Sequence, residues 1–456
     1  MKPFIYRGKE VRNIGLFGPG KSTIALLTHL KSNYSDLNFT LRSDSLISND
    51  SELHSYGFDR IFSGKEALSQ INEDVIFFSP SVRRERIKEL APATVLSSEI
   101  EYFFEHCSYD VFSVTGSDGK STTVTLCADI LMSAYGSSVA VGNIGVPAVT
   151  SLSDPTNTPI ACELSSFQLN YFAPSSKRAL VTNISENHLD WHRTFNEYVE
   201  AKRNIYSNAK ECVFNFNSPI TLDIATVKGA FAVYSSTANF SELRSNIKAE
   251  NYVYQENGTI MLNGGPLCPI DLIPLKSSHN IENMMAAIAL CADVSTAQII
   301  DTVAKNFKGL PHRCESIGVF DGVKYIDSSI DTSPKRTATT LSTISGPLIV
   351  IIGGRSKTPD YSLIVPILKQ RAKAIVLTGE NGKQLFDMLS KEGFCLPTVF
   401  TEDFKEAIEC ARYLSHPGDT VILSPASTSF DRFKSFEERG ELFKKTVFDI
   451  CGYANG

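Results

Sequence analysis

The chain has 456 residues, of which 42% are hydrophobic and 21% are charged. This length is too great for one hydrophobic core and predicts two or three domains. The formal net charge of -6 and the pI near 5.8 argue against a nucleic-acid-binding protein. No run reaches the roughly 18 apolar residues of a membrane span, and the amino-terminal residues lack a signal-peptide core, so we expect a cytoplasmic protein without a membrane anchor. The cysteines form no Cys-x-x-Cys pair, which indicates reduced core residues.

Residues 1–105 alternate short strands with helical segments, as in a small parallel α/β domain. The strands are expected at 11–17, 38–42 and 75–79. After the first of these, Gly15-Leu-Phe-Gly-Pro-Gly-Lys-Ser22 matches the strict phosphate-loop pattern G-x4-G-K-[ST]. That strand is weak, however, and Pro19 stiffens the loop that has to wrap the phosphates. An alternative is a dinucleotide-type turn, with Asp44 reading a ribose hydroxyl.

A second phosphate-type turn follows the β-prone run 110–114. It reads Thr115-Gly-Ser-Asp-Gly-Lys-Ser-Thr-Thr123, with Val114 where the strict pattern has its first glycine. The free N–H groups and the positive dipole of the following helix make a site for polyphosphate. Lys120 adds a charge for the outer phosphates, and the hydroxyl of Ser121 or Thr122 can ligate Mg²⁺. Two such turns indicate two nucleotide sites, and the composition does not say which one holds ATP.

Polar side chains follow the next strands of the central stretch. Asn143, Glu163 and His188 each come at or just after the end of an expected strand. Because the carboxyl ends of parallel strands meet at one edge of a sheet, we expect these residues near the second phosphate turn. Glu163 and His188 are possible hard-metal ligands beside the Ser121 hydroxyl. A structural role is an equally open alternative for the cluster of His188, Asp190 and His192.

The last third of the chain predicts another α/β domain. A helix from Ser278 comes first, and Asn280 or Asn283 can simply cap it. The segment Gly309–Arg313 then interrupts the pattern. Beyond it, strands alternate with helices, at 323–327, 347–352, 374–377, 398–400 and 420–423. The prediction is therefore an α/β protein of three domains, spanning 1–107, 108–308 and 309–456.

Several motifs resemble those of the Mur ligase family, which also includes folylpolyglutamate synthetases. Thr115–Thr123 is similar to the family's ATP loop, and further motifs follow in the family's order at 163–168, 187–190, 201–202, 279–283 and 309–313. Two carboxyl-terminal motifs, 353–361 and 423–440, resemble the branch that adds D-glutamate to UDP-N-acetylmuramoyl-L-alanine in peptidoglycan synthesis.

The resemblance implies a ligase with a Rossmann-like amino-terminal domain for UDP, a central P-loop-type ATPase domain and a Rossmann-like carboxyl-terminal domain for the amino acid. It assigns ATP to 116–122 and the UDP diphosphate to Gly15–Ser22. The implied reaction passes through an acyl phosphate and uses ATP and Mg²⁺. The implied enzyme is a cytoplasmic monomer that binds neither nucleic acid nor membrane.

The resemblance also implies site residues. Catalysis and metal binding fall on Lys120, Ser121, Glu163, His188 and Lys202, the last as a carbamate that ligates Mg²⁺. The implied ATP contacts are Gly116, Ser117, Asp118, Gly119, Lys120, Ser121, Thr122, Asn283, Arg313 and Asp327. Those for the UDP substrate are Gly15, Gly18, Gly20, Lys21, Ser22, Ser43, Asp44, Asn143 and Ser165. Those for D-glutamate are Thr332, Lys357, Ser429 and Phe436.

Some positions depart from the family. Phe17 stands where many members have glycine, and 326–334 only partly follow the family's pattern around Asp327. Asp331 stands where a small residue is usual, which nothing in the sequence explains.

Two alternatives to the D-glutamate assignment follow from the same motifs. A Mur-type or folylpolyglutamate-type ligase for another amino acid would share the ATP loop and the metal residues. The motif at 423–440 argues against it. A non-catalytic nucleotide-binding regulator would need only the loop glycines and lysine, so the combination of Lys120, Glu163, His188 and Lys202 argues against that reading.

Overall fold

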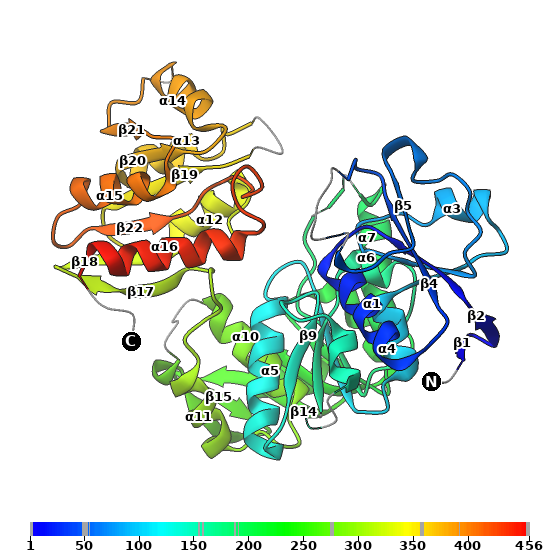
Figure 1. Ribbon diagram of the computed structural model, residues 1–456. Helices are drawn as coiled ribbons and strands as arrows, with labels where there is room; N and C mark the ends of the chain where they lie inside the picture. Colours follow the sequence, from blue (N-terminus) through cyan, green and yellow to red (C-terminus); the bar gives the residue numbers. More distant parts are fainter. Residues whose placement is uncertain are drawn as a thin grey trace. The chain divides into compact units, whose positions relative to one another are not determined.

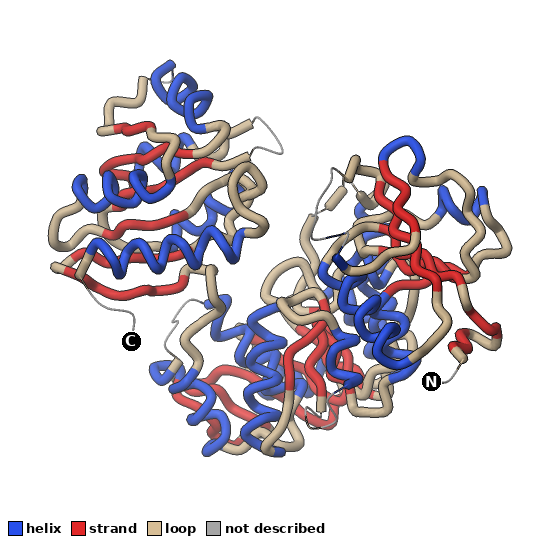
Figure 2. Tube along the Cα trace, viewed as in Figure 1, coloured by secondary structure: helices blue, strands red, loops and turns tan. Residues whose placement is uncertain are grey.

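The computed structural model describes residues 3–47, 53, 55–153, 156, 159–186, 188–189, 191–273, 278–355, 360–391 and 393–452. Three main sheets follow one another along the chain, each flanked by helices (Figure 1). Figure 2 shows the alternation of helix and strand in each region. The predicted fold class, α/β in three successive domains, is confirmed. The chain divides into two compact units, Met1–Phe307 and Lys308–Gly456, and the domain boundaries at 107/108 and 308/309 stay predictions.

The amino-terminal sheet has five parallel strands in the order β5 (Arg60–Ser63), β4 (Asn38–Ser43), β3 (Asn13–Phe17), β6 (Val75–Phe78) and β7 (Val95–Ser98). Its helices are α1 (Lys21–Asn33), α3 (Glu85–Leu90) and α4 (Glu99–His106). The strand expected at 11–17 is wrong at its start. Val11 instead ends a small antiparallel hairpin of β1 (Phe4–Tyr6) and β2 (Lys9–Val11), which packs its apolar residues under α1.

The central sheet has nine strands. Their order is β16 (Gly265–Pro269), β15 (Thr259–Leu262), β14 (Ala249–Glu256), β13 (Ala230–Ser235), β12 (Glu211–Asn215), β11 (Arg178–Val181), β8 (Val111–Thr115), β10 (Ile160–Glu163) and β9 (Val139–Gly142). The strands from β8 to β14 are parallel, and β15 and β16 add an antiparallel end. Asn257 and Gly258 form the tight turn of the hairpin between β14 and β15, and both residues have the positive φ that such a turn needs.

Two hydrophobic layers cover the central sheet. One face packs against α5 (Lys120–Tyr135), α10 (Ser278–Leu290) and α11 (Ala297–Asn306). The other packs against α4, α8 (Leu222–Lys228), α9 (Phe240–Asn246) and the 3-10 turn η3 (Asn204–Tyr206). Two further helices, α6 (Ser166–Leu169) and α7 (Phe195–Arg203), pack on each other.

The carboxyl-terminal sheet has the order β17 (Glu315–Phe320), β18 (Val323–Asp327), β22 (Thr420–Leu423), β19 (Leu348–Gly353), β20 (Ala372–Thr378) and β21 (Thr398–Phe400). Only β17 runs antiparallel. One face carries α15 (Phe404–Leu414) and α16 (Phe436–Ile450). The other carries α12 (Pro334–Thr343), α13 (Val365–Arg371) and α14 (Gly382–Lys391). The strands predicted in this region are confirmed, with small shifts at their ends.

The strand orders decide where ligands can bind. In the central sheet β8 lies between β10 and β11, and in the amino-terminal sheet β3 lies between β4 and β6. Connections leave such a strand in opposite directions and open a crevice at its carboxyl end, where ligands of α/β proteins usually bind. Both phosphate-type turns follow these two strands. No helix among the described residues is long and apolar enough to span a bilayer.

Candidate active site

The loop between β8 and α5 is built on two glycines. Gly116 has φ 153° and Gly119 has φ 79°, backbone angles that residues other than glycine adopt only at an energetic cost. A Cβ on Gly116 would lie 1.9 Å from Thr182 Oγ1, and one on Gly119 would lie 2.2 Å from Asn283 Oδ1. The loop is therefore pressed against its neighbours so closely that neither position has room for a side chain.

The end of β11 holds this loop in shape. Asn183 accepts hydrogen bonds from the backbone N–H of Ser117 through its carbonyl (2.8 Å) and of Asp118 through its side chain (3.0 Å). Thr182 Oγ1 donates to the Asp118 carbonyl at 2.6 Å, and Ser117 Oγ bonds the Tyr198 hydroxyl at 2.8 Å. The sequence analysis did not single out Thr182, Asn183 or Tyr198. For the first two a signal existed, since they are polar residues at the end of a strand beside β8.

Lys120 opens α5 and folds back over the loop. Its Nζ donates to the carbonyls of Gly116 (2.8 Å) and Ser117 (2.9 Å). The N-cap of α5 is Gly119, which has no side chain to occupy the first N–H groups of the helix, so these groups can meet an anion. Ser121 is half-buried beside Lys120, and Thr122 is buried.

Glu163 ends β10 at the same edge and is buried. Its Oε1 accepts a hydrogen bond from Asn143 Nδ2 at 2.8 Å. Its Oε2 is also buried and has no partner among the described residues. A buried carboxylate oxygen without a donor is costly, and a hard cation such as Mg²⁺ would satisfy it. The donor set therefore fits the predicted metal, and Asn143 orients the ligand.

Lys202 lies on α7 and is 1% exposed. Its Nζ donates to the Gly116 carbonyl at 2.7 Å and to Thr115 Oγ1 at 3.3 Å, and it lies over the Tyr198 ring. Burial, with the charge of Lys120, lowers the pKa of Lys202 well below its usual value. The structure thus brings the two lysines to one carbonyl and favours a neutral amine at Lys202.

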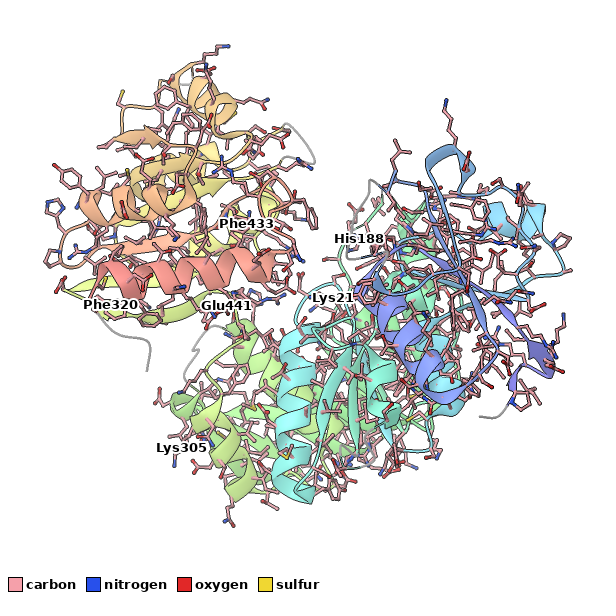
Figure 3. All side chains as sticks on the ribbon, viewed as in Figure 1. Lys21, His188, Lys305, Phe320, Phe433 and Glu441 are labelled. Carbon is pink, nitrogen blue, oxygen red and sulfur yellow. The ribbon has the colours of Figure 1, made fainter. Side chains whose placement is uncertain are left out.

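The histidines of the predicted cluster lie differently. His188, labelled in Figure 3, is exposed and has φ 55°, an unusual value for a residue other than glycine. His192 is buried, its Nε2 lies 3.0 Å from Ser166 Oγ, and burial with the charges of His188 and Lys202 lowers its pKa to about 4. His188 therefore faces solvent as a ligand could, whereas His192 packs inside. Asn187 and Asp190 lie outside the described residues.

Ser165 and Asn283 have structural contacts of their own. Ser165 is the N-cap of α6 in a capping box with Gln168, so the two satisfy the first N–H groups of that helix. Asn280 and Asn283 lie inside α10, which begins at Ser278, so their interpretation as its cap is wrong. Asn283 instead touches the phosphate loop at Gly119.

The amino-terminal loop differs from a strict phosphate loop. Gly15 is inside β3, paired with Thr40, and does not line the turn. Gly18 has φ 91°, and a Cβ there would lie 2.8 Å from Ser79 Cβ. Gly20 precedes α1 without a side-chain cap, and exposed Lys21 (Figure 3) and half-buried Ser22 begin the helix. Ser43 ends β4 and Asp44 follows it.

The packing of Phe17 explains why a phenylalanine stands at this position, where many family members have glycine. Phe17 is 1% exposed and stacks on Phe78 with ring centroids 5.7 Å apart. It is part of the small core cluster that includes Phe78.

The carboxyl-terminal residues gather at the end of β18 and the start of α16. Asp327 is fully buried, and its two oxygens take hydrogen bonds from Ser329 N (2.8 Å) and His312 Nδ1 (2.7 Å). A ribose contact at Asp327 therefore has to share an oxygen with His312. Arg313 is half-buried next to His312.

Arg439 joins three segments around the predicted amino-acid site. Its guanidinium donates to Ser329 Oγ (3.0 Å), the Ser329 carbonyl (2.9 Å) and the Ser427 carbonyl (3.1 Å). Ser329 Oγ in turn donates to the Phe436 carbonyl at 2.8 Å. Burial lowers the pKa of Arg439 to about 10. The sequence analysis missed this residue, although it lies in the motif at 423–440.

The other residues predicted for the carboxyl-terminal site are placed as follows. Ser429 is buried at the start of a turn, where its carbonyl accepts from the N–H groups of Arg432 and Phe433. Thr332 is half-buried after Asp331. Asp331 is buried and accepts a hydrogen bond from Ser424 Oγ at 2.8 Å, so it ties the turn after β18 to the end of β22. Lys357 lies outside the described residues.

Comparisons with known proteins agree with these observations. The family model described as the Mur ligase middle domain matches residues 114–291, and the one described as the Mur ligase, glutamate ligase domain matches 312–427. The UDP-N-acetylmuramoylalanine–D-glutamate ligase of Acetivibrio thermocellus is 34% identical over 97% of this chain and 98% of its own. The enzyme of the same name from Clostridium novyi is 34% identical over 98% of both.

Solved structures share the fold at lower identity. The UDP-N-acetylmuramate–alanine ligase of Thermotoga maritima has a TM-score of 0.61 and 17% identity, covering 97% of this chain and 100% of that one. A pseudomurein peptide ligase of Methanothermus fervidus has a TM-score of 0.54 and 18% identity, covering 96% and 100%. Together, the phosphate loop, the family models and the full-length relatives confirm the resemblance seen in the motifs. The chain belongs to the Mur ligase family.

Proposed function

We propose that the protein is an ATP-dependent ligase that joins D-glutamate to UDP-N-acetylmuramoyl-L-alanine in peptidoglycan synthesis. The observation that carries the catalytic part is the edge beside β8, where Lys120, Lys202 and the unpartnered Glu163 oxygen meet one phosphate loop. The substrates are those in the names of relatives that match over nearly the whole chain. We also propose a monomeric, cytoplasmic enzyme.

The reaction has two steps. The terminal carboxylate of the nucleotide substrate attacks the γ-phosphorus of ATP, which forms an acyl phosphate and expels ADP. The D-glutamate amine then attacks the acyl carbon, and the tetrahedral intermediate expels phosphate and loses a proton. Several anions meet in this site, so catalysis depends on fixed cations and N–H donors that neutralise the charge as it moves.

The phosphate loop supplies these donors. Lys120 exchanges the carbonyls of Gly116 and Ser117 for the outer phosphates when ATP enters. The N–H groups at the start of α5 face the same phosphates, since no side chain caps that helix. Asn283 lies beside the loop for the adenine contact, and Arg313 and Asp327 complete the predicted ATP set.

Ser121, Glu163, His188 and modified Lys202 would hold Mg²⁺, which screens the phosphate charge. Asn143 holds Glu163 Oε1 by a hydrogen bond, and Oε2, which has no partner among the described residues, would be the oxygen offered to the cation. Burial and the charge of Lys120 lower the pKa of the Lys202 amine, which favours its neutral form. The neutral amine can attack CO₂ and form a carbamate with release of a proton. The carbamate would supply an anionic oxygen ligand, which unmodified lysine cannot offer to Mg²⁺.

The other substrates bind at the two remaining sheets. The turn Gly18–Ser22, with Ser43 and Asp44, holds the UDP group at the carboxyl edge of the amino-terminal sheet. Asn143 and Ser165 lie near the substrate carboxyl. Thr332, Lys357, Ser429 and the Phe436 backbone bind the two carboxylates of D-glutamate.

The test is release of ADP and phosphate with UDP-N-acetylmuramoyl-L-alanine, Mg²⁺ and ATP, measured with D-glutamate, L-glutamate, L-lysine or L-alanine. Turnover with D-glutamate alone is the expected result. Turnover with another amino acid would keep the mechanism and move the specificity. Tight ATP binding without turnover would favour the nucleotide-binding regulator.

A further inference from the structure

Trp191 lies where the turn that carries His188 meets the amino-terminal domain, and it is the only tryptophan in the chain. The backbone N–H groups of Trp191 and His192 both donate to the His188 carbonyl, at 3.1 and 2.9 Å. The three residues thus form one hydrogen-bonded turn. The position of Trp191 is therefore tied to the backbone of His188 by hydrogen bonds.

The indole is held from the other side by the turn after β6. Trp191 Nε1 donates to the Ser81 carbonyl at 3.2 Å, and the Arg83 guanidinium carbon lies 5.2 Å from the centroid of the indole ring. A guanidinium at this distance from an aromatic face is attracted by the ring. Ser81 and Arg83 follow a strand at the carboxyl edge of the amino-terminal sheet, where the nucleotide substrate is proposed to bind.

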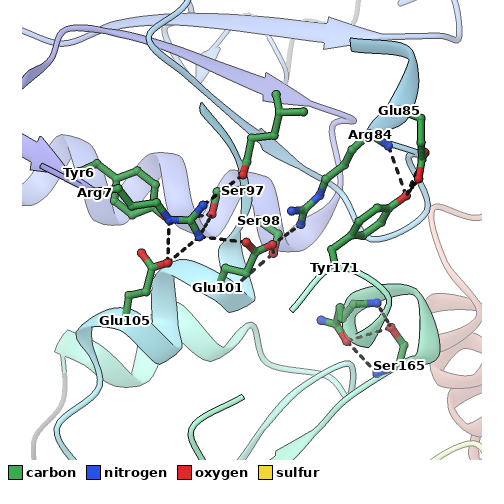
Figure 4. A network of polar contacts seen from close by, with 12 residues as sticks. Tyr6, Arg7, Arg84, Glu85, Ser97, Ser98, Glu101, Glu105, Ser165 and Tyr171 are labelled. Carbon is green, nitrogen blue, oxygen red and sulfur yellow. Dashed lines mark hydrogen bonds and ion pairs between the residues drawn. The ribbon is translucent and has the colours of Figure 1, made fainter. Parts of the chain in front are cut away.

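The same turn is anchored by a polar network (Figure 4). The backbone N–H of Arg84 donates to the Tyr171 hydroxyl at 3.3 Å, and that hydroxyl donates to Glu85 at 3.2 Å. The Arg84 side chain pairs with Glu101 and lies over the Tyr171 ring. Residues 81–85 are therefore fixed to α4 through Glu101 and to the central domain through Tyr171.

Phe167 completes the support. Its ring centroid lies 4.8 Å from that of Trp191 and 4.9 Å from that of His188. His188 has φ 55°, a conformation that costs energy outside glycine and persists only where the surroundings hold it. The contacts with Trp191 and Phe167, together with the Tyr198 ring 6.5 Å away, are among those that hold it.

We propose that Arg83 and Trp191 are positioning residues that hold His188 in its cation-binding conformation and so couple nucleotide-substrate binding to cation binding. This inference rests on the proposed function, in which His188 is a metal ligand. A nucleotide that contacts the turn 81–85 adds to the interactions that hold Trp191 and with it His188, so the cation binds more tightly. By linkage, the cation tightens nucleotide binding by the same factor.

The experiment measures Mn²⁺ affinity in place of Mg²⁺ by equilibrium dialysis, with a non-hydrolysable ATP analogue present, with and without UDP-N-acetylmuramoyl-L-alanine. The variants are Arg83→Gln, which removes the cation, and Trp191→Phe, which keeps a ring and removes the N–H. Arg60→Gln is the matched control, since Arg60 is an exposed arginine at the start of β5 in the same sheet. Trp191 emission reports nucleotide binding in every protein except Trp191→Phe.

We expect the nucleotide to change Trp191 emission and to tighten Mn²⁺ binding about three- to tenfold in the wild type and in Arg60→Gln. In Arg83→Gln and Trp191→Phe the tightening should fall below about twofold. Equal tightening in all four proteins would overturn the inference, as would nucleotide binding that leaves Mn²⁺ affinity unchanged in the wild type. A nucleotide that does not bind the wild type contradicts the proposed function itself. No arm depends on which amino acid is ligated.

Discussion

At the scale of single residues, the site is marked by buried ionisable groups whose charged forms the protein does not stabilise. Glu163 keeps one buried oxygen without a partner among the described residues, and Lys202 is a buried amine beside a second lysine. Structures usually avoid both arrangements because burying an ionisable group without a charged or hydrogen-bonding partner for its charged form is costly. Their presence around one loop indicates that ligands supply the missing partners.

Lys202 makes this cost measurable. The pKa of Lys202 is lower in the folded protein than its unfolded value of 10.5, so the folded state binds the proton less tightly. Lys202 therefore destabilises the folded protein. This destabilisation is largest at pH values below the folded pKa and disappears as the pH rises to 10.5. In CO₂-free buffer, the thermal midpoint of Lys202→Met relative to that of the wild type should therefore be higher at pH 7 than at pH 10. The same variant should lose about a hundredfold or more in turnover.

Lys210→Met is the control, since Lys210 is an exposed lysine of the same unit. It should show neither the pH-dependent difference nor the loss of turnover. A Lys202→Met difference that is constant between pH 7 and pH 10 would mean that this amine is charged in the folded protein.

Arg439 makes a second prediction at this scale. Its guanidinium is buried, and within the described part of the chain its hydrogen bonds go to hydroxyl and carbonyl oxygens of Ser329 and Ser427, next to the proposed site of a dicarboxylate. Arg439→Lys keeps the charge but cannot make all these bonds. We expect the KM for D-glutamate to rise about tenfold or more, and the KM for ATP to change little. Equal changes in both constants would argue for a general loss of structure.

At the scale of elements, the phosphate loop depends on how closely α10 approaches the start of α5. Gly119 has φ 79°, and a Cβ there would lie 2.2 Å from Asn283 Oδ1. Gly136, at the other end of α5, has φ 76° with nothing within 4 Å. The two glycines share the same strain and differ only in their contacts.

Alanine at each position separates these effects. Both variants should lose about 1 to 2 kcal/mol of stability from the left-handed backbone, measured by urea unfolding. Only Gly119→Ala should also weaken ATP binding, because Asn283 or the loop has to move. An unchanged affinity for ATP in Gly119→Ala would show that the contact does not shape the site.

The start of α4 gives a pH-dependent prediction. Glu99 is buried, and its Oε1 accepts from Val149 N at 2.6 Å in the 3-10 turn η2 (Ala148–Ser153). Burial raises the pKa of Glu99 from 4.5 to about 7, although the backbone N–H groups of Val149 and Ala148 oppose this shift. The folded state therefore binds the proton more tightly, and the stability that this gives is lost as pH rises from 4.5 through 7.

Glu99→Gln removes this titration and keeps an acceptor for Val149. Its stability relative to the wild type should rise between pH 4.5 and 7 and stay level above pH 7, as followed by thermal unfolding. Glu250→Gln, at an exposed glutamate, should give no such slope. A flat profile for Glu99→Gln would contradict the account of this helix start.

At the scale of the whole molecule, sequence patterns predicted most of the fold because buried parallel strands are short apolar runs that end in polar turns. The strands at 398–400 and 420–423 agree with β21 and β22 residue for residue. The hairpin of β1 and β2 escaped because its strands are only three residues long. The phosphate loop could be predicted because its spacing follows from local geometry. Arg439 and the partners of Lys202 could not, because they depend on segments that meet only after folding.

The central claim is the acyl-phosphate ligation, and oxygen transfer tests it most directly. The protein is incubated with ATP, Mg²⁺, D-glutamate and UDP-N-acetylmuramoyl-L-alanine labelled with ¹⁸O in its terminal carboxylate. The masses of the amide product and of the released phosphate are then measured by mass spectrometry. We expect an amide product with added D-glutamate and one labelled oxygen in each phosphate released. Product with unlabelled phosphate would contradict the acyl phosphate, and absence of the D-glutamate product would contradict the proposed function.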